Sequence, residues 1–97
     1  MRQTKMGSMM SEYLKGIAET LKNMMIDEGF KFGKCESRVF YFERFKIYVW
    51  ENSVSVSIYE SVEDILKDKD MDYPVEPILL GHIQPIVDWL AVWGVRP

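Results

Sequence analysis

Apolar and polar side chains alternate with a period of two through most of the stretch from Arg38 to Glu60. The apolar members are Phe45, Ile47, Val49, Val54, Val56 and Ile58. The residues that alternate with them are Lys46, Tyr48, Trp50, Ser53, Ser55, Ser57 and Tyr59. Successive side chains of a strand point to opposite faces of a sheet. The pattern therefore predicts antiparallel strands with one apolar face, which needs a helix to cover it, and one aromatic and polar face.

Upstream of this stretch the apolar spacing becomes helical. The residues that form one stripe are Met10, Leu14, Ile17, Leu21 and Met24, with Met25 beside them. This spacing predicts an amphipathic helix. Ser8 or Ser11 is placed to cap its first turn, and Gly29 is placed to end it in a left-handed conformation. We expect residues 1–7 to be a flexible tail.

The sheet is expected to begin with the two phenylalanine pairs 30/32 and 40/42. Turns are predicted around 35–37, at 43–44 and at 51–53, where Asn52 tolerates the left-handed region that tight turns need. The interpretation is an antiparallel meander of three to four strands between Phe30 and Tyr59.

After the meander the pattern predicts a short helix from Ser61 to about Lys69, a charged loop over 68–77 and a brief extended piece at 78–80. A final helix should start near Pro85 and stop at Gly94. Its apolar face is expected to contain Ile83, Ile86, Val87, Leu90 and Trp93. The order of elements predicts one α+β domain, 1–97, with the C-terminal helix packed on the sheet.

The formal net charge is −3, and its distribution is uneven. The first fifty residues carry nine basic and six acidic side chains, whereas the remainder carry three and nine. An acidic balance disfavours non-specific nucleic-acid binding, which rests on phosphate neutralisation. The asymmetry suits head-to-tail or partner electrostatics, as well as a simple solvated surface.

The single cysteine, Cys35, rules out an intrachain disulfide and fits a reducing compartment. The first residues lack the apolar core of a signal peptide. The most hydrophobic stretch, 78–95, is interrupted by polar residues and is too short for a convincing membrane span. We therefore expect a cytoplasmic protein with no membrane partner.

Metal and catalytic motifs are weak in this sequence. Asp68, Asp70 and Asp72 have the spacing of the first ligands of a calcium-binding EF-hand loop, but Tyr73 and Leu79 occupy the positions that need Gly and Glu. A solvated acidic loop is the simpler interpretation. No metal and no cofactor are predicted.

His82 is the only histidine, and we expect it to cap or flank the last helix. A catalytic pair with Cys35 would need a spatial arrangement that the sequence does not indicate. No phosphate loop, nucleophile elbow or paired-carboxylate signature is present. The prediction is a protein that is not an enzyme.

The aromatic and polar sheet face is the best candidate for a working surface, because Tyr and Trp are enriched at interfaces. The predicted interaction residues are Tyr41, Lys46, Tyr48, Trp50, Tyr59 and Trp89. Trp89 is included because it falls off the apolar stripe of the last helix. That helix is then apolar nearly all round and needs cover on two sides, from the rest of the chain or from a second copy.

The leading hypothesis is a small non-enzymatic protein–protein interaction or accessory domain that acts as a homodimer. One alternative is single-stranded nucleic-acid binding through stacked aromatic rings and cations on the same face. A second is an apolar small-molecule pocket between helix and sheet, for which the seven methionines are weak encouragement. A further alternative is that the chain's own last helix covers this face.

Overall fold

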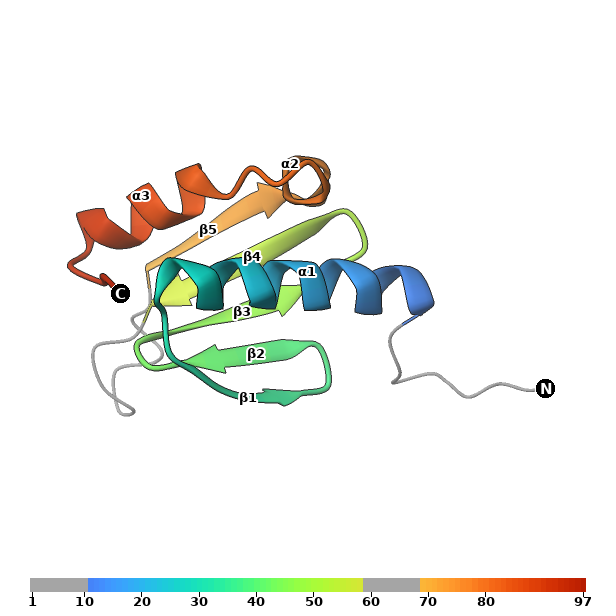
Figure 1. Cartoon of the computed structure of the whole chain (residues 1–97), viewed down its shortest axis with the longest axis horizontal. Coiled ribbons are helices and arrows are strands. Elements are labelled where there is room, and N and C mark those ends of the chain that lie inside the picture. The colour runs from blue at the N-terminus through green and yellow to red at the C-terminus, as the bar shows by residue number, and fades with distance from the viewer. Residues whose placement is uncertain (1–10, 59–68) are drawn as a thin grey trace.

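The computed structural model describes residues 11–58 and 69–97 and has the α+β architecture that the sequence predicts. Its elements are α1 (Glu12–Glu28), β1 (Phe32–Glu36), β2 (Val39–Phe42), β3 (Phe45–Val49), β4 (Ser53–Ile58), β5 (Lys69–Pro74), α2 (Val75–Leu79) and α3 (Gln84–Val92). The five strands form one antiparallel sheet in the order β1-β2-β3-β4-β5 (Figure 1). The meander therefore has one strand more than the largest number predicted.

Both predicted ends of the first helix are confirmed. The Ser11 hydroxyl accepts the backbone N–H of Leu14 at 3.2 Å, which caps the first turn. Gly29 adopts φ 108°, and its N–H donates to the carbonyl of Ile26 at 2.9 Å. The residues that α1 buries are Leu14, Ile17, Ala18, Leu21 and Met25. They follow the stripe read from the sequence.

The three predicted turns are also present as hairpin connections. The first lies between β1 and β2, where Ser37 has φ 58°. The second joins β2 to β3 through residues 43–44, and the third joins β3 to β4 with the Trp50 N–H donating to the Ser53 carbonyl at 2.8 Å. Strands β3 and β4 show the period-two burial that the sequence predicts.

The prediction of a charged loop over 68–77 is wrong, because β5 occupies most of this segment. Its Tyr73 is buried and its Met71 packs against the core, whereas Asp70 and Asp72 are exposed. The alternation is that of a half-buried strand paired along its length with β4. The two-residue spacing of Asp70 and Asp72, which resembles that of a calcium-binding loop, is therefore the periodicity of a strand.

The extended piece predicted at 78–80 is also wrong. Ile78 and Leu79 belong to α2, and Ile78 is fully buried. Pro77 does not prevent this helix, because it stands in the first turn, where its missing N–H has no helical acceptor to lose. Lys69 begins β5 rather than ending a helix. The rest of the helix predicted from Ser61, and the predicted tail 1–7, lie outside the described residues.

The last helix starts and stops as predicted, with Pro85 in its first turn and Gly94 at φ 80° just beyond its end. Ile83, Ile86 and Leu90 are buried, as expected. Trp93 is not part of the core: it caps the helix and is 42% exposed.

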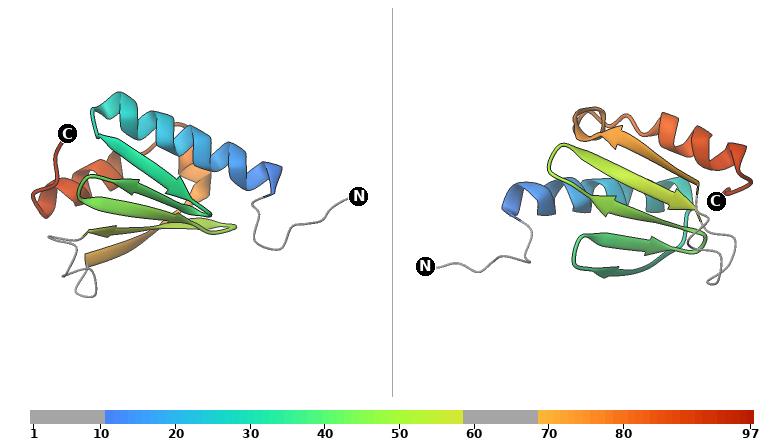
Figure 2. Two further views of the ribbon diagram at one scale, coloured as in Figure 1. Left: turned by 90° about the horizontal axis from the view of Figure 1, so that it is seen from below. Right: turned by 180° about the vertical axis from the view of Figure 1, so that it is seen from behind.

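All three helices lie on the same side of the sheet (Figure 2). A single hydrophobic core joins the inner sides of α1, α2 and α3 to the apolar face of the strands. Within residues 11–58 and 69–97, no helix has the length and hydrophobicity needed to cross a membrane.

Candidate functional site

The sheet face opposite the helices, here called the open face, has no described element packed on it (Figure 2, right). Its side chains alternate with the buried residues of each strand. They are Lys34, Glu36, Val39, Tyr41, Lys46, Tyr48, Ser53, Ser55, Ser57, Asp70, Asp72 and Pro74. The prediction of one apolar and one aromatic–polar face is therefore correct, and α3 does not cover the second.

A pair of aromatic rings forms a ridge on the central strand. The rings of Tyr48 and Trp50 have centroids 4.4 Å apart at 37°. Trp50 is 46% exposed although its indole N–H is satisfied: it donates to the Ser55 hydroxyl at 2.8 Å. The Ser55 hydroxyl in turn donates to Oδ1 of Asp72 at 2.7 Å. This chain of hydrogen bonds runs across β3, β4 and β5 and fixes the orientation of an exposed tryptophan.

Next to the aromatic ridge the side chains of the open face are short, because every open-face residue of β4 is a serine. The resulting groove has a volume of about 660 Å³. Its lining residues are Arg38, Trp50, Glu51, Asn52, Ser53, Ser55 and Asp72. One wall is thus aromatic, the opposite wall carries a carboxylate, and the floor offers hydroxyl groups.

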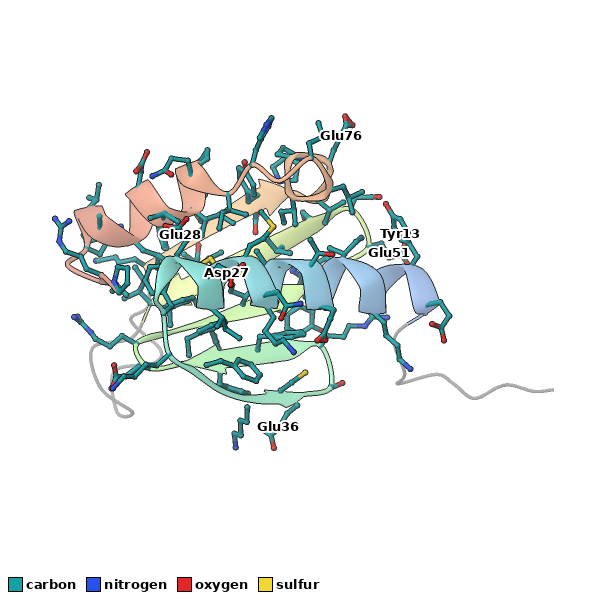
Figure 3. All side chains as sticks on the ribbon, in the orientation of Figure 1. Tyr13, Asp27, Glu28, Glu36, Glu51 and Glu76 are labelled. Carbon is teal, nitrogen blue, oxygen red and sulfur yellow. The ribbon has the colours of Figure 1, made fainter. Side chains whose placement is uncertain are left out.

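A second groove of about 330 Å³ extends this one around the β3–β4 turn. Both grooves are lined by Arg38, Glu51 and Asn52, and the second reaches Tyr13 at the start of α1. Figure 3 shows Tyr13 and Glu51 near each other at this end of the molecule. The two grooves therefore adjoin at these three shared residues.

Basic and acidic side chains lie on different sides of the open face. Lys34 lies 5.4 Å from the centre of the Tyr41 ring, and Lys46 stands directly beside Tyr41 on the next strand. At the far side, Asp70 and Asp72 project from β5. Lys46 forms no ion pair with any residue that the structure describes. The β1–β3 side is therefore mainly basic and the β5 side acidic.

Four of the six predicted interaction residues come together here, namely Tyr41, Lys46, Tyr48 and Trp50. Tyr59 lies outside the described residues. Trp89 lies elsewhere: it is partly buried and packs against the core on the helical side. The aspartates of β5 were missed as members of the surface, and the alternation of 69–74 was the signal that would have revealed them.

The alternative catalytic pair is not assembled. Cys35 lies on β1 at one edge of the sheet. His82 is exposed and its carbonyl accepts the Tyr73 hydroxyl at 2.9 Å, which places it at the opposite edge. It does not cap α3, because the N-cap residue is Ile83 and no side chain bonds there. Across the described ranges, no three His, Cys, Asp or Glu side chains cluster as a metal site would require.

A smaller pocket of about 180 Å³ at the end of the chain contains three cations, Lys31, Arg44 and Arg96. Residues just beyond the ends of α1 and α3, Gly29 and Gly94, also line it. Arg44 donates to the Gly94 carbonyl at 3.1 Å. Arg44 therefore stabilises the chain just beyond the end of α3, where a cation is favoured.

Comparison with known proteins adds no assignment: no family model, no curated protein and no solved structure matches this chain significantly.

Proposed function

We propose that the protein is a non-enzymatic protein–protein interaction domain that acts as a homodimer and receives an extended segment of a partner protein on the open face. The observation that supports this most is the serine-floored groove beside Trp50. Its aromatic wall is exposed yet held in place by the bonds to Ser55 and Asp72. A rigid, exposed aromatic side chain is the usual energetic centre of a protein interface.

The chemistry of the groove favours a partner segment with a basic side chain. Asp72 and Glu51 are exposed and form no ion pair with a described residue. A Lys or Arg side chain in this groove would lie between carboxylates and the face of an indole ring, an arrangement that stabilises cations. A backbone group of the segment would find a hydroxyl partner in Ser53, because the hydroxyl of Ser55 is already bonded to Trp50 and Asp72.

Nucleic acid fits the same surface less well. The rings of Tyr48 and Trp50 would suit stacked bases, and Lys46 would suit a phosphate. The groove itself, however, is lined by two carboxylates, Asp72 and Glu51, against one cation, Arg38, and this balance disfavours a phosphate backbone. An apolar ligand between α1 and the sheet would have to displace side chains that fill this space, because Ile17, Met25 and Ile47 are fully buried.

Selection of binders from an unbiased peptide library tests the proposal. Selected peptides should carry Lys or Arg next to an apolar residue. Their affinity should fall at least tenfold in Trp50→Ala and in Asp72→Asn, the second of which keeps an acceptor for Ser55 but removes the charge. The matched controls are Trp93→Ala and Glu76→Gln, which change an exposed tryptophan and an exposed carboxylate away from the open face.

Equal binding by the groove variants and the wild type would overturn the proposal, as would a failure to select any peptide. A short single-stranded oligonucleotide is the competing probe. Quenching of Trp50 fluorescence by this oligonucleotide, lost on raising the salt concentration and absent in Lys46→Gln, would assign the face to nucleic acid instead.

A further inference from the structure

Strand β1 is a free edge of the sheet. It pairs with β2 on one side, and no described strand pairs with its other side. The side chains of Lys34 and Glu36 are 64% and 60% exposed, and Figure 3 shows Glu36 projecting from this edge. An open edge presents unpaired backbone N–H and C=O groups, which makes it a template for another strand.

The two ion pairs formed within the described residues lie on either side of Cys35, one on β1 and one on α1. On the open face, Nζ of Lys34 lies 3.4 Å from Oε1 of Glu36. On the helical face, Lys22 pairs with Glu19, and both charges act on the Cys35 thiol. Cys35 itself stands opposite the buried Phe40 and so faces the helices.

The opposite charges of Lys34 and Glu36 are placed symmetrically about Cys35, so two copies of β1 can complement each other. In an antiparallel pair of β1 strands related by a two-fold axis, Cys35 lies opposite the second copy's Cys35. Lys34 then lies opposite the second copy's Glu36, and Glu36 opposite its Lys34. Opposite charges directly across an antiparallel pair are stabilising. An isologous contact repeats each favourable pair twice.

We propose that the protein dimerises by pairing β1 with β1 of a second copy, in antiparallel register about Cys35, to form a continuous ten-stranded sheet. The proposal rests on the homodimer of the proposed function and gives that dimer its interface. Both open faces then lie on the same side of one sheet, and both copies of α1 lie on the other. The edge contact leaves both grooves accessible.

A guarded edge is the competing explanation. Natural sheets protect free edges with short strands, bulges and charged residues, and β1 has five residues and a register shift at Gly33. A guard made of one charge sign repels a second copy, however. The alternation of Lys34 and Glu36 about a central residue attracts it, which is why we favour pairing over protection.

Charge reversal gives a test with an internal rescue. Lys34→Glu places carboxylates opposite one another across the axis, and Glu36→Lys places two cations there. Each variant should weaken association about thirtyfold, because two attractive exposed pairs become repulsive. The double variant Lys34→Glu/Glu36→Lys should associate like the wild type, and the two single variants should form a heterodimer when mixed. Sedimentation velocity over a concentration series measures each case.

Lys15→Glu on the exposed side of α1 is the matched control for the change in net charge, and it should leave association unchanged. A short bismaleimide should link two chains through Cys35 in the wild type and in the double variant, but not in the single variants. A strictly monomeric wild type overturns the proposal, as does a double variant that fails to recover. Peptide binding by monomeric Lys34→Glu separates the two proposals, because loss of the dimer would leave the groove intact.

Discussion

Among the residues that the structure describes, the hydroxyl of Ser55 is the centre of the hydrogen-bond chain that crosses the open face, so Ser55→Ala is the most informative single substitution. It removes the acceptor of the Trp50 indole N–H and the donor to Asp72, at 2.8 and 2.7 Å. A neutral hydrogen bond contributes about 0.5–1.5 kcal/mol net, and one to a charged group about 1.5–3 kcal/mol. Water replaces part of both at this exposed site, so we expect a loss of about 1–2 kcal/mol.

Ser57→Ala is the matched control, because Ser57 lies on the same strand and face and its hydroxyl bonds no described residue. The difference between the two variants removes the intrinsic effect of Ala in a strand. Urea unfolding followed by circular dichroism measures the free energy of unfolding without relying on tryptophan emission. A loss of this size should lower Tm by about 4–8 °C for each kcal/mol.

A double-mutant cycle with Trp50→Phe isolates the bond to the indole. Phe keeps an aromatic ring beside Tyr48 but has no N–H, so the cycle should show a coupling of about 0.5–1.5 kcal/mol. With Trp89 and Trp93 replaced by Phe, so that Trp50 is the only tryptophan, the fluorescence anisotropy should fall in Ser55→Ala as the ring gains freedom. If Ser55→Ala is as stable as Ser57→Ala and the cycle shows no coupling, the hydrogen bonds do not hold Trp50 and the groove loses its rigid wall.

The remaining predictions concern a helix end and the thiol at the sheet edge. Gly29→Ala should destabilise more than Gly94→Ala in denaturant unfolding, because both have positive φ but a Cβ at Gly29 would lie 2.9 Å from the Cβ of Pro97, whereas Gly94 faces open space; equal losses would contradict the steric part of this reasoning. Burial raises the pKa of the Cys35 thiol and Lys22 lowers it. Lys22→Gln should therefore move the pH midpoint of iodoacetamide alkylation upwards, and a downward shift would refute the assignment.

The raised pKa of Cys35 also predicts the direction in which the free energy of unfolding changes with pH. The folded state holds the thiol proton more tightly than the unfolded chain, so this group makes stability fall as pH rises past the ordinary thiol value of 9.0. The effect should disappear in Cys35→Ser. Unfolding curves on either side of that pH measure it.

The sequence predicts those strands of the fold in which the alternation of apolar and polar residues is complete. In β3 and β4 each inward position is apolar, so the period-two alternation is complete. In β5 only Met71 and Tyr73 carry the inward pattern, and the surrounding aspartates are disfavoured in strands. Pairing with β4 decides the structure of this segment, and that contact is not local in the sequence. Helix α2 was missed for a similar reason, since Pro77 indicates a loop unless its position in the first turn is known.

The candidate surface is predicted in part: the alternation in β3 reveals its aromatic residues, whereas the contribution of β5 depends on a contact that is not local in the sequence. Alternation placed Lys46, Tyr48 and Trp50 on one face, as observed. The neighbouring carboxylates of β5 are not predicted as members of this face, because the sequence of that segment indicates a loop. Trp89 is predicted as an interaction residue because it falls off the apolar stripe of the last helix, and the sequence does not show that the core extends far enough to cover it.

The presence of β5 in the sheet changes the chemistry of the open face, because it adds carboxylates to it. A face with only Lys46, Tyr48 and Trp50 would suit a phosphate backbone and stacked bases. Asp70 and Asp72 place negative charge along its other side, one strand away from the serines. Serine is a weak strand former compared with Thr or Val, so three in a row on the open side of β4 are not explained by the stability of the strand. The small side chains of Ser53 and Ser55 line the groove between Trp50 and Asp72. This composition is the reason why we propose a basic, extended segment of a partner protein as its ligand.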